Sequence, residues 1–119
     1  MMENKNLESI INKIAFEIVD EGILDSNEIN KLLGVLSNDG VYAMWVYSKA
    51  EKKIEENKLI NKLTPIFQLI IPAFKSENEK EYENAFQKIA EDLNNLLFIK
   101  ELLEKILIYA RYHAKAMEE

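Results

Sequence analysis

Hydrophobic residues recur at intervals of three and four along most of the chain, which is the spacing that places them on one face of a helix. The first series comprises Leu7, Ile10, Ile11, Ile14, Ala15 and Ile18. Glutamate, asparagine and lysine fill positions between these residues. The pattern predicts an amphipathic helix that ends near Gly22, because glycine commonly follows the last turn of a helix.

Asp25 and Glu28 have the spacing of a capping box, in which each side chain hydrogen-bonds a backbone amide of the other residue. The apolar series that follows is Ile29, Leu32, Leu33 and Leu36. Together these signals predict a second helix directly after the first.

The connection between these two helices also has some of the composition of a calcium-binding loop. Counted from Asp20, however, Gly22, Leu24 and Lys31 occupy positions three, five and twelve. A calcium loop requires oxygen ligands at those positions. A helix end followed by a helix start therefore explains the connection better than a calcium site.

Ser-Asn-Asp-Gly at residues 37–40 is the next break, because Asn38 or Asp39 can cap a helix and Gly40 can adopt backbone angles closed to other residues. The helix after it is apolar nearly all round, through Val41, Ala43, Met44, Trp45, Val46, Tyr47, Ala50 and Ile54. We interpret it as the central helix of a bundle, which emerges into water at the charged residues from Lys49 onwards. The alternative is an aromatic binding platform around Trp45.

In the second half, Thr64 is expected to cap a short apolar helix with Pro65 in its first position, ended or kinked by Pro72. Ser76 and Glu79 form a second capping-box pair that starts another helix. Its apolar face comprises Tyr82, Ala85, Phe86, Ile89, Ala90 and Leu93.

Asn94 and Asn95 weaken helical continuity, and a final helix is predicted beyond them. Its apolar stripe comprises Ile99, Leu102, Leu103, Ile106, Ala110, His113 and Met117. No alternating β-type pattern is present. The fold class predicted is all-α, a compact bundle of five to six helices, organised as a single helical domain over residues 1–119.

Composition agrees with one hydrophobic core, since 48% of the 119 residues are apolar and 30% are charged. There is no cysteine, so disulfides and thiolate metal sites are excluded. Residues 1–10 lack the pattern of a signal peptide. The apolar segment 63–74 is interrupted by Pro65, Gln68 and Pro72 and is shorter than the ~20 residues that span a bilayer. We expect a cytoplasmic protein with no membrane association.

Catalytic chemistry has few candidate residues, because His113 is the single histidine and no cysteine is present. His113 belongs to the inner stripe of the last helix, so we interpret it as an imidazole packed at the bundle edge. The Glu-x-x-His pairs of di-iron bundles and a glycine-rich phosphate loop are absent. We therefore expect no enzyme, no cofactor and no metal; an enzyme would require His113 in a cleft beside carboxylates.

The net charge of −6 opposes non-specific binding to nucleic acid, but the charge is uneven. Residues 1–30 contain seven acids and two lysines, whereas residues 49–62 contain five lysines and three acids. The candidate nucleic-acid-binding residues are Lys49, Lys52, Lys53, Arg111 and Lys115. They form one patch if the two helices that carry them are neighbours; otherwise they are solvated helix ends.

Two stretches resemble the small helical subunit of the type III-B CRISPR-Cas effector, the Cmr complex. Residues 35–53 are similar to the family's Asn-Gly-Leu turn and aromatic-rich helix ending in Ser-Lys, with Gly40 at the glycine, Val41 at the leucine and Ser48 before Lys49 at the exit. Residues 106–119 are similar to its C-terminal Trp-x-Lys-Arg-Phe-Ala-x-Ala pattern. In that pattern the matching positions are Tyr109, Arg111, His113, Ala114 and Ala116.

This resemblance implies a non-catalytic subunit that packs against copies of itself and larger backbone subunits along a guide RNA paired with its target. The five cations would then neutralise RNA phosphates without reading bases. The alternative is a helical protein-protein interaction module, an adaptor or a virus-encoded protein, with no nucleic-acid role. In that case the segment 63–74 is a candidate partner surface, although core filling explains it more simply.

Overall fold

The computed structural model describes residues 2–75 and 77–118, with the side chains of residues 2–6 and 79 outside the description. The described chain forms six helices: α1 (Met2–Asp20), α2 (Ser26–Asp39), α3 (Val41–Ala50), α4 (Glu56–Phe67), α5 (Glu79–Ala90) and α6 (Leu93–Met117). No strand occurs within those residues. The predicted all-α fold is confirmed.

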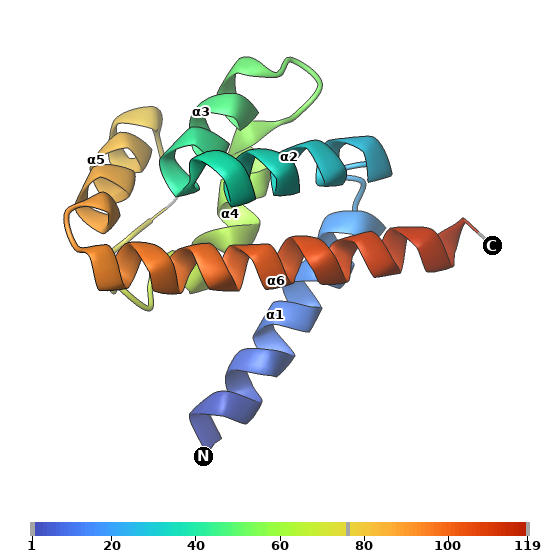
Figure 1. Ribbon diagram of the computed structural model, residues 1–119, viewed down its shortest axis with the longest axis horizontal. Coiled ribbons are helices and arrows are strands. Elements are labelled where there is room, and N and C mark those ends of the chain that lie inside the picture. The colour runs from blue at the N-terminus through green and yellow to red at the C-terminus, as the bar shows by residue number, and fades with distance from the viewer. Residues whose placement is uncertain (1, 76, 119) are drawn as a thin grey trace.

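The last helix, α6, organises the others. Its 25 residues span roughly 38 Å at 1.5 Å per residue, and it contacts each of the other five helices. Figure 1 shows α1 crossing α6 while α2 runs along it. The prediction that the tryptophan-bearing helix is central is wrong, because α3 has only 10 residues and packs mainly against α2 and α5.

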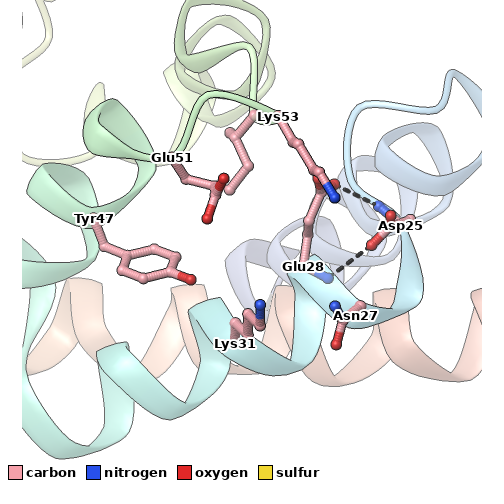
Figure 2. A pocket seen from close by; sticks show the side chains of 8 residues that line it. Asp25, Asn27, Glu28, Lys31, Tyr47, Glu51 and Lys53 are labelled. Carbon is pink, nitrogen blue, oxygen red and sulfur yellow. Dashed lines mark hydrogen bonds between the residues drawn. The ribbon is translucent and has the colours of Figure 1, made fainter.

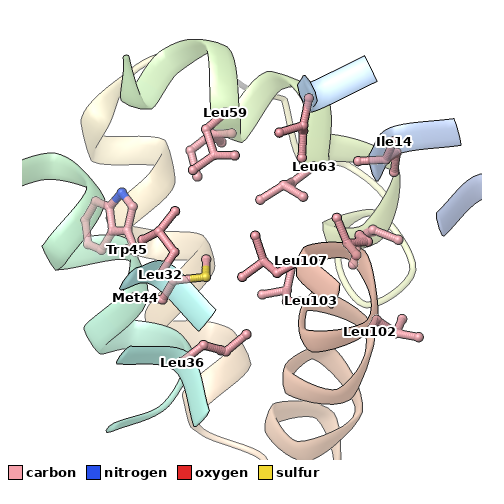
Figure 3. Packing of buried hydrophobic residues seen from close by; sticks show 14 of the residues in the cluster. Ile14, Leu32, Leu36, Met44, Trp45, Leu59, Leu63, Leu102, Leu103 and Leu107 are labelled. Carbon is pink, nitrogen blue, oxygen red and sulfur yellow. The ribbon is translucent and has the colours of Figure 1, made fainter. Parts of the chain in front are cut away.

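The buried side chains form one continuous hydrophobic cluster (Figure 3). Every helix contributes to it, α1 through Ile14, α3 through Met44 and Trp45, and α6 through Leu103, for example. The cluster leaves a narrow, wholly apolar void of about 10 Å³ between α1, α2, α3, α4 and α6. The core is thus packed almost without space for a ligand.

The turn between α1 and α2 follows the sequence prediction. Gly22 has φ 69°, so it occupies the left-handed region that glycine reaches without strain. The Asp25 side chain accepts a hydrogen bond from the Glu28 amide at 2.8 Å, and Glu28 accepts one from the Asp25 amide at 2.9 Å. The predicted capping box is confirmed, and it fixes where α2 begins.

The break before α3 differs from the prediction that Asn38 or Asp39 caps the helix. Both residues lie in the last turn of α2, and Gly40 alone separates the two helices. Gly40 has φ 100°, and no side chain caps α3. Gly40 is at once the residue after α2 and the N-cap position of α3, which leaves no position for a separate capping residue.

The region from Lys49 to Phe67 is also organised differently. The third helix ends at Ala50, and α4 begins at Glu56 rather than at Thr64. Pro65 lies inside the last turn of α4, while the Thr64 hydroxyl donates to the Ile60 carbonyl at 3.1 Å. The buried stripe of α4 outweighs the local start signal of Thr64 and Pro65; it comprises Leu59, Ile60, Leu63, Ile66 and Phe67.

Helix α5 begins at Glu79, where Asn78 is the N-cap and accepts from the Glu81 amide at 2.9 Å. The predicted pair of Ser76 with Glu79 lies outside the described residues and side chains.

The break between α5 and α6 falls at residues 91–92 rather than at the two asparagines. Asp92 caps α6 by accepting from the Asn95 amide at 3.1 Å. Leu93 therefore starts a new helix and is 67% exposed, instead of continuing the buried face of α5.

Most large hydrophobic side chains of the segment 63–74 pack in or against the core, as the simpler interpretation predicted. Leu63, Ile66, Phe67 and Phe74 are buried, whereas Leu69 is exposed. Within the described part of the chain, no helix is both long enough and apolar enough to span a bilayer.

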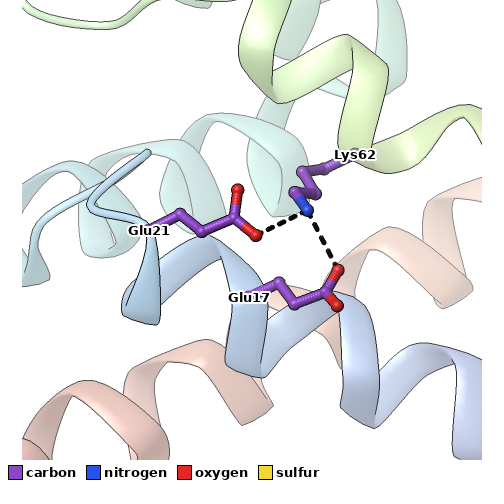
Figure 4. Close-up of polar contacts among 3 residues, drawn as sticks. All are labelled: Glu17, Glu21 and Lys62. Carbon is purple, nitrogen blue, oxygen red and sulfur yellow. Dashed lines mark hydrogen bonds and ion pairs between the residues drawn. The ribbon is translucent and has the colours of Figure 1, made fainter.

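One lysine links α4 to the end of α1. The Lys62 ammonium donates to Glu17 at 3.0 Å and to Glu21 at 2.8 Å (Figure 4). The hydrogen bond to Glu21, followed by that to Glu17, raises the pKa of Lys62 above its ordinary value. The interaction is therefore complete at neutral pH, below the pKa of the unfolded chain, and is lost only as pH rises through the folded pKa.

Replacing Lys62 with glutamine is expected to lower the free energy of unfolding by about 0.5 to 1 kcal/mol, because two partly exposed ion pairs are lost together. The loss should shrink at ~1 M salt, where charges are screened within about 3 Å. Urea titrations at low and high salt measure it. Lys58→Gln is the matched control, since Lys58 makes one exposed pair with Glu55; equal effects of the two variants would contradict a linking role.

Candidate functional site

The first group of predicted cations lies where α3 ends. Lys49 is in the last turn of α3, and Lys52 and Lys53 belong to the connection 51–55; all three side chains are exposed. The Lys49 ammonium lies 4.7 Å from the centroid of the Trp45 ring. This cation–π contact gives Lys49 a structural role, whatever else it binds.

Lys53 borders a polar hollow of about 80 Å³ between α2 and the end of α3 (Figure 2). Figure 2 shows Lys53 directed toward the capping box of Asp25 and Glu28. The charged side chains around the hollow are Asp25, Glu28, Lys31, Glu51 and Lys53. With three carboxylates against two ammonium groups, the hollow itself does not favour a phosphate.

The second group, Arg111 and Lys115, lies on the exposed surface of α6. Arg111 is seven residues after Glu104 and seven before Glu118, so the three share one face of the helix. That face borders α2, because Ser37 donates to Glu104 at 2.9 Å and Ser26 donates to Glu118 at 3.1 Å. Arg111 therefore has an acidic neighbour two turns away on either side.

Each group lies on one short segment of the chain, and the first turn of α2 lies between the two groups. Asp25 lines the polar hollow with Lys53, and it also lines a second hollow with Ala114 and Glu118 of α6. In Figure 1, α2 separates the connection after α3 from the C-terminal end of α6. A polyanion that spanned both groups would pass the carboxylates of Asp25 and Glu28.

Trp45 itself is fully buried, which supports the core interpretation rather than the aromatic platform. Its ring stacks on Phe86 of α5 with centroids 5.0 Å apart, and its indole N–H donates to Glu56 at 2.5 Å. The opposite side of α3 is exposed, through Tyr42 and Val46. Only one face of α3 packs in the core. The sequence did not show which face this is, because apolar residues occur nearly all round the helix.

Sequence reasoning missed a polar link between α3 and α5. The Tyr42 hydroxyl donates to the Glu83 carboxylate, which also accepts from the Gln87 amide at 2.7 Å. The hydrogen bond with Tyr42 lowers the pKa of Glu83, and the same bond raises the pKa of Tyr42. The Tyr42–Glu83 hydrogen bond therefore links α3 to α5.

His113 lies at the seam between α6 and α1, as predicted for an imidazole at the bundle edge. Its Nε2 is 3.0 Å from the Asn12 side-chain oxygen, and its ring meets Phe16 edge-on with centroids 5.6 Å apart. These partners are an amide and an aromatic ring, which orient the imidazole but do not activate it as a base.

The described side chains contain no group of three histidine, cysteine or acidic residues arranged to hold a metal ion.

An exposed apolar surface occupies the first two turns of α6. Leu93 is 67% exposed, Leu97 is 53% exposed and Phe98 is 39% exposed. Leu93 and Leu97 are one helical turn apart, so their side chains are neighbours. We call these three residues the α6 apolar face. The signal was present in the sequence, but Leu93 was assigned to the buried stripe of the preceding helix.

Comparison of the chain with protein-family models, curated proteins and solved structures yields no match.

Proposed function

We propose that this protein is a non-catalytic helical subunit that works by binding other macromolecules in an assembly. The observation that carries the proposal is the α6 apolar face, where Leu93 and Leu97 are exposed one helical turn apart and Phe98 is exposed in the same part of the helix. Adjacent exposed apolar residues are typical of protein-protein contact sites, whereas isolated ones are common on any surface. The partner surface is thus α6 rather than the segment 63–74.

The specific assembly proposed is the type III-B CRISPR effector, in which the chain would be the small subunit, acting in antiviral defence in the cytoplasm. Support comes from the resemblance of residues 35–53 and 106–119 to that family and from the exposure of all five candidate cations. In this role, Lys52, Lys53, Arg111 and Lys115 contact phosphates of the guide or target RNA, while Lys49 also stabilises Trp45.

The RNA contact is tested with Lys52→Glu, Lys53→Glu and Arg111→Glu combined, which leaves the Lys49–Trp45 contact intact. We expect at least tenfold weaker binding of single-stranded RNA at low salt, because three phosphate contacts are lost. The slope of log K against log salt should fall by about 2. Fluorescence anisotropy at several salt concentrations, alone and in the assembled complex, measures both.

The control reverses Lys75, Lys80 and Lys88, three exposed lysines that give the same change in net charge. Circular dichroism verifies that helicity is retained in both variants. If the two triple variants bind RNA equally, or if the native assembled complex shows no salt-dependent RNA binding, the nucleic-acid role is refuted.

A second candidate is a protein-binding module without any nucleic-acid role. It is favoured by the carboxylates of Asp25 and Glu28, which lie between the two cation groups. Under this proposal the α6 apolar face is the only functional requirement, and the cations are solvated helix ends.

Both candidates predict that Leu93→Asp combined with Leu97→Asp abolishes association with partner proteins while the fold is kept. Exposed substitutions usually change the free energy of unfolding by no more than about 0.5 kcal/mol each. Co-purification with the products of neighbouring genes measures association. Lys88→Asp serves as an exposed control, and unchanged co-purification of the double variant would refute the assembly role.

A further inference from the structure

A second surface lies at the opposite end of α6 from the α6 apolar face. The end of α1, the start of α2 and the C-terminal turns of α6 meet on one side of the molecule (Figure 1). Between them is an open groove of about 290 Å³. This volume is at the lower limit for small-molecule pockets, ~300 Å³, and suits a single side chain with its backbone.

The floor of this groove is apolar. It is formed by Val19 of α1, Leu24 of the connection, and Ala114 and Met117 of α6. Leu24 and Ala114 are buried, whereas Met117 is 57% exposed at the edge. An exposed methionine beside an apolar floor adapts its shape to an incoming aliphatic group, because its side chain is unbranched and flexible.

The rim of the groove is acidic. Asp25 and Glu118 line it. The helices α1 and α6 both end here, so the negative ends of two helix dipoles add to the carboxylates. The positive end of α2 is occupied by its own capping box. Two basic residues are near the groove. Lys115 is in the last turn of α6, and Lys53 lines the neighbouring hollow together with Asp25.

Ser26 orients one of these carboxylates. Its hydroxyl donates to one oxygen of Glu118 at 3.1 Å, which ties the end of α6 to the start of α2. A carboxylate has two oxygens that each accept more than one hydrogen bond, so Glu118 keeps the capacity to accept from a cation.

We infer that this groove binds a basic peptide segment of a partner protein, with an aliphatic side chain on the apolar floor and an adjacent lysine or arginine at the carboxylate rim. Charge complementarity selects this occupant, because an acidic peptide or a nucleic-acid phosphate would face the carboxylates and two negative helix ends. The inference is independent of the α6 apolar face, since the two surfaces are at opposite ends of one helix.

The probe is a capped pentapeptide, Gly-Leu-Lys-Lys-Gly, titrated into the full-length, isotope-labelled protein and followed by NMR. Two matched peptides replace leucine with serine or both lysines with glutamate. We expect saturable shifts at the amides of Val19, Gly22, Ser26 and Met117 with the first peptide. Affinity for either matched peptide should be at least tenfold lower, and affinity for the first should fall as salt is raised.

The variant Met117→Ser with Glu118→Lys should weaken binding at least tenfold. The control, Leu97→Ser with Glu101→Lys, makes the same kinds of change at the other end of the same helix and should leave binding unchanged. Circular dichroism verifies the fold of each variant.

Equal binding of the basic and acidic peptides, an absence of saturable shifts, or shifts away from the groove would each overturn the inference. So would concentration-dependent self-association that shifts the same amides, since it would assign the groove to a second copy of the chain. The control variant alters the α6 apolar face but not the groove. Loss of assembly in the control variant and loss of peptide binding in the groove variant are therefore separate results.

Discussion

Replacing Trp45 with alanine is expected to lower the free energy of unfolding by about 3 to 5 kcal/mol, the range for removing a buried large aromatic side chain. Trp45 has no exposed surface, and its ring stacks on Phe86 with centroids 5.0 Å apart and meets Tyr42 edge-on with centroids 5.6 Å apart. The change opens a cavity between α3 and α5. It also removes the hydrogen bond from the indole N–H to Glu56 and the cation–π contact with Lys49.

A domain of this kind has a total stability of roughly 5 to 15 kcal/mol, so the loss should move the urea midpoint far toward zero. Unfolding is followed by helical circular dichroism, because Trp45 is the chain's single tryptophan and its fluorescence is lost with it. The matched control is Val46→Ala, one residue along the same helix, where the side chain is 43% exposed. It should change stability by no more than about 0.5 kcal/mol.

If Trp45→Ala shifts the midpoint no more than Val46→Ala does, Trp45 is not part of the core in solution. The aromatic-platform interpretation of α3 would then replace the core interpretation.

Replacing Ile106 with alanine is expected to lower the free energy of unfolding by about 2 to 5 kcal/mol. Ile106 has no exposed surface and borders the apolar void at which five of the six helices meet. Side chains from five helices line this position, and they can close only partly around the deleted atoms, because they would have to move away from contacts on their other sides. The loss should therefore fall in the upper half of this range.

A graded series tests the cause. Ile106→Val removes one methyl group and should cost about 0.5 to 1.5 kcal/mol. Ile108→Ala deletes the same atoms two residues along α6, where the side chain is only partly buried, and should cost less than half as much as Ile106→Ala. Urea unfolding of the three variants measures the series. Equal losses of unfolding free energy in Ile106→Ala and Ile108→Ala would show that Ile106 is no more buried than Ile108.

The positions of most helices were predictable because they depend on interactions between residues close in the sequence. The capping box of Asp25 with Glu28 and the glycine stops at Gly22 and Gly40 are local, and the structure contains each of them at the predicted place. The prediction failed where a local signal opposed a buried stripe. Thr64 and Pro65 look like a helix start, but the apolar stripe from Leu59 to Phe67 places them at a helix end.

The candidate site was predictable only as a set of exposed residues. Sequence placed Lys49, Lys52 and Lys53 near one helix exit and Arg111 with Lys115 on the last helix, and the structure exposes all five. Whether the two groups can face one ligand depends on which residues lie between them in space. Spacing along the chain carries no information about that. The intervening turn with Asp25 and Glu28 comes from a third helix.

The sequence by itself determined an all-α chain, its main turns and the burial of the chief hydrophobic stripes, because helix periodicity and capping act over a few residues. Only the tertiary structure decided that α6 is the central helix, that Leu93, Leu97 and Phe98 remain uncovered, and that an acidic groove forms where three helix ends meet. Those outcomes depend on which faces pack together, and packing joins residues that are far apart in the chain.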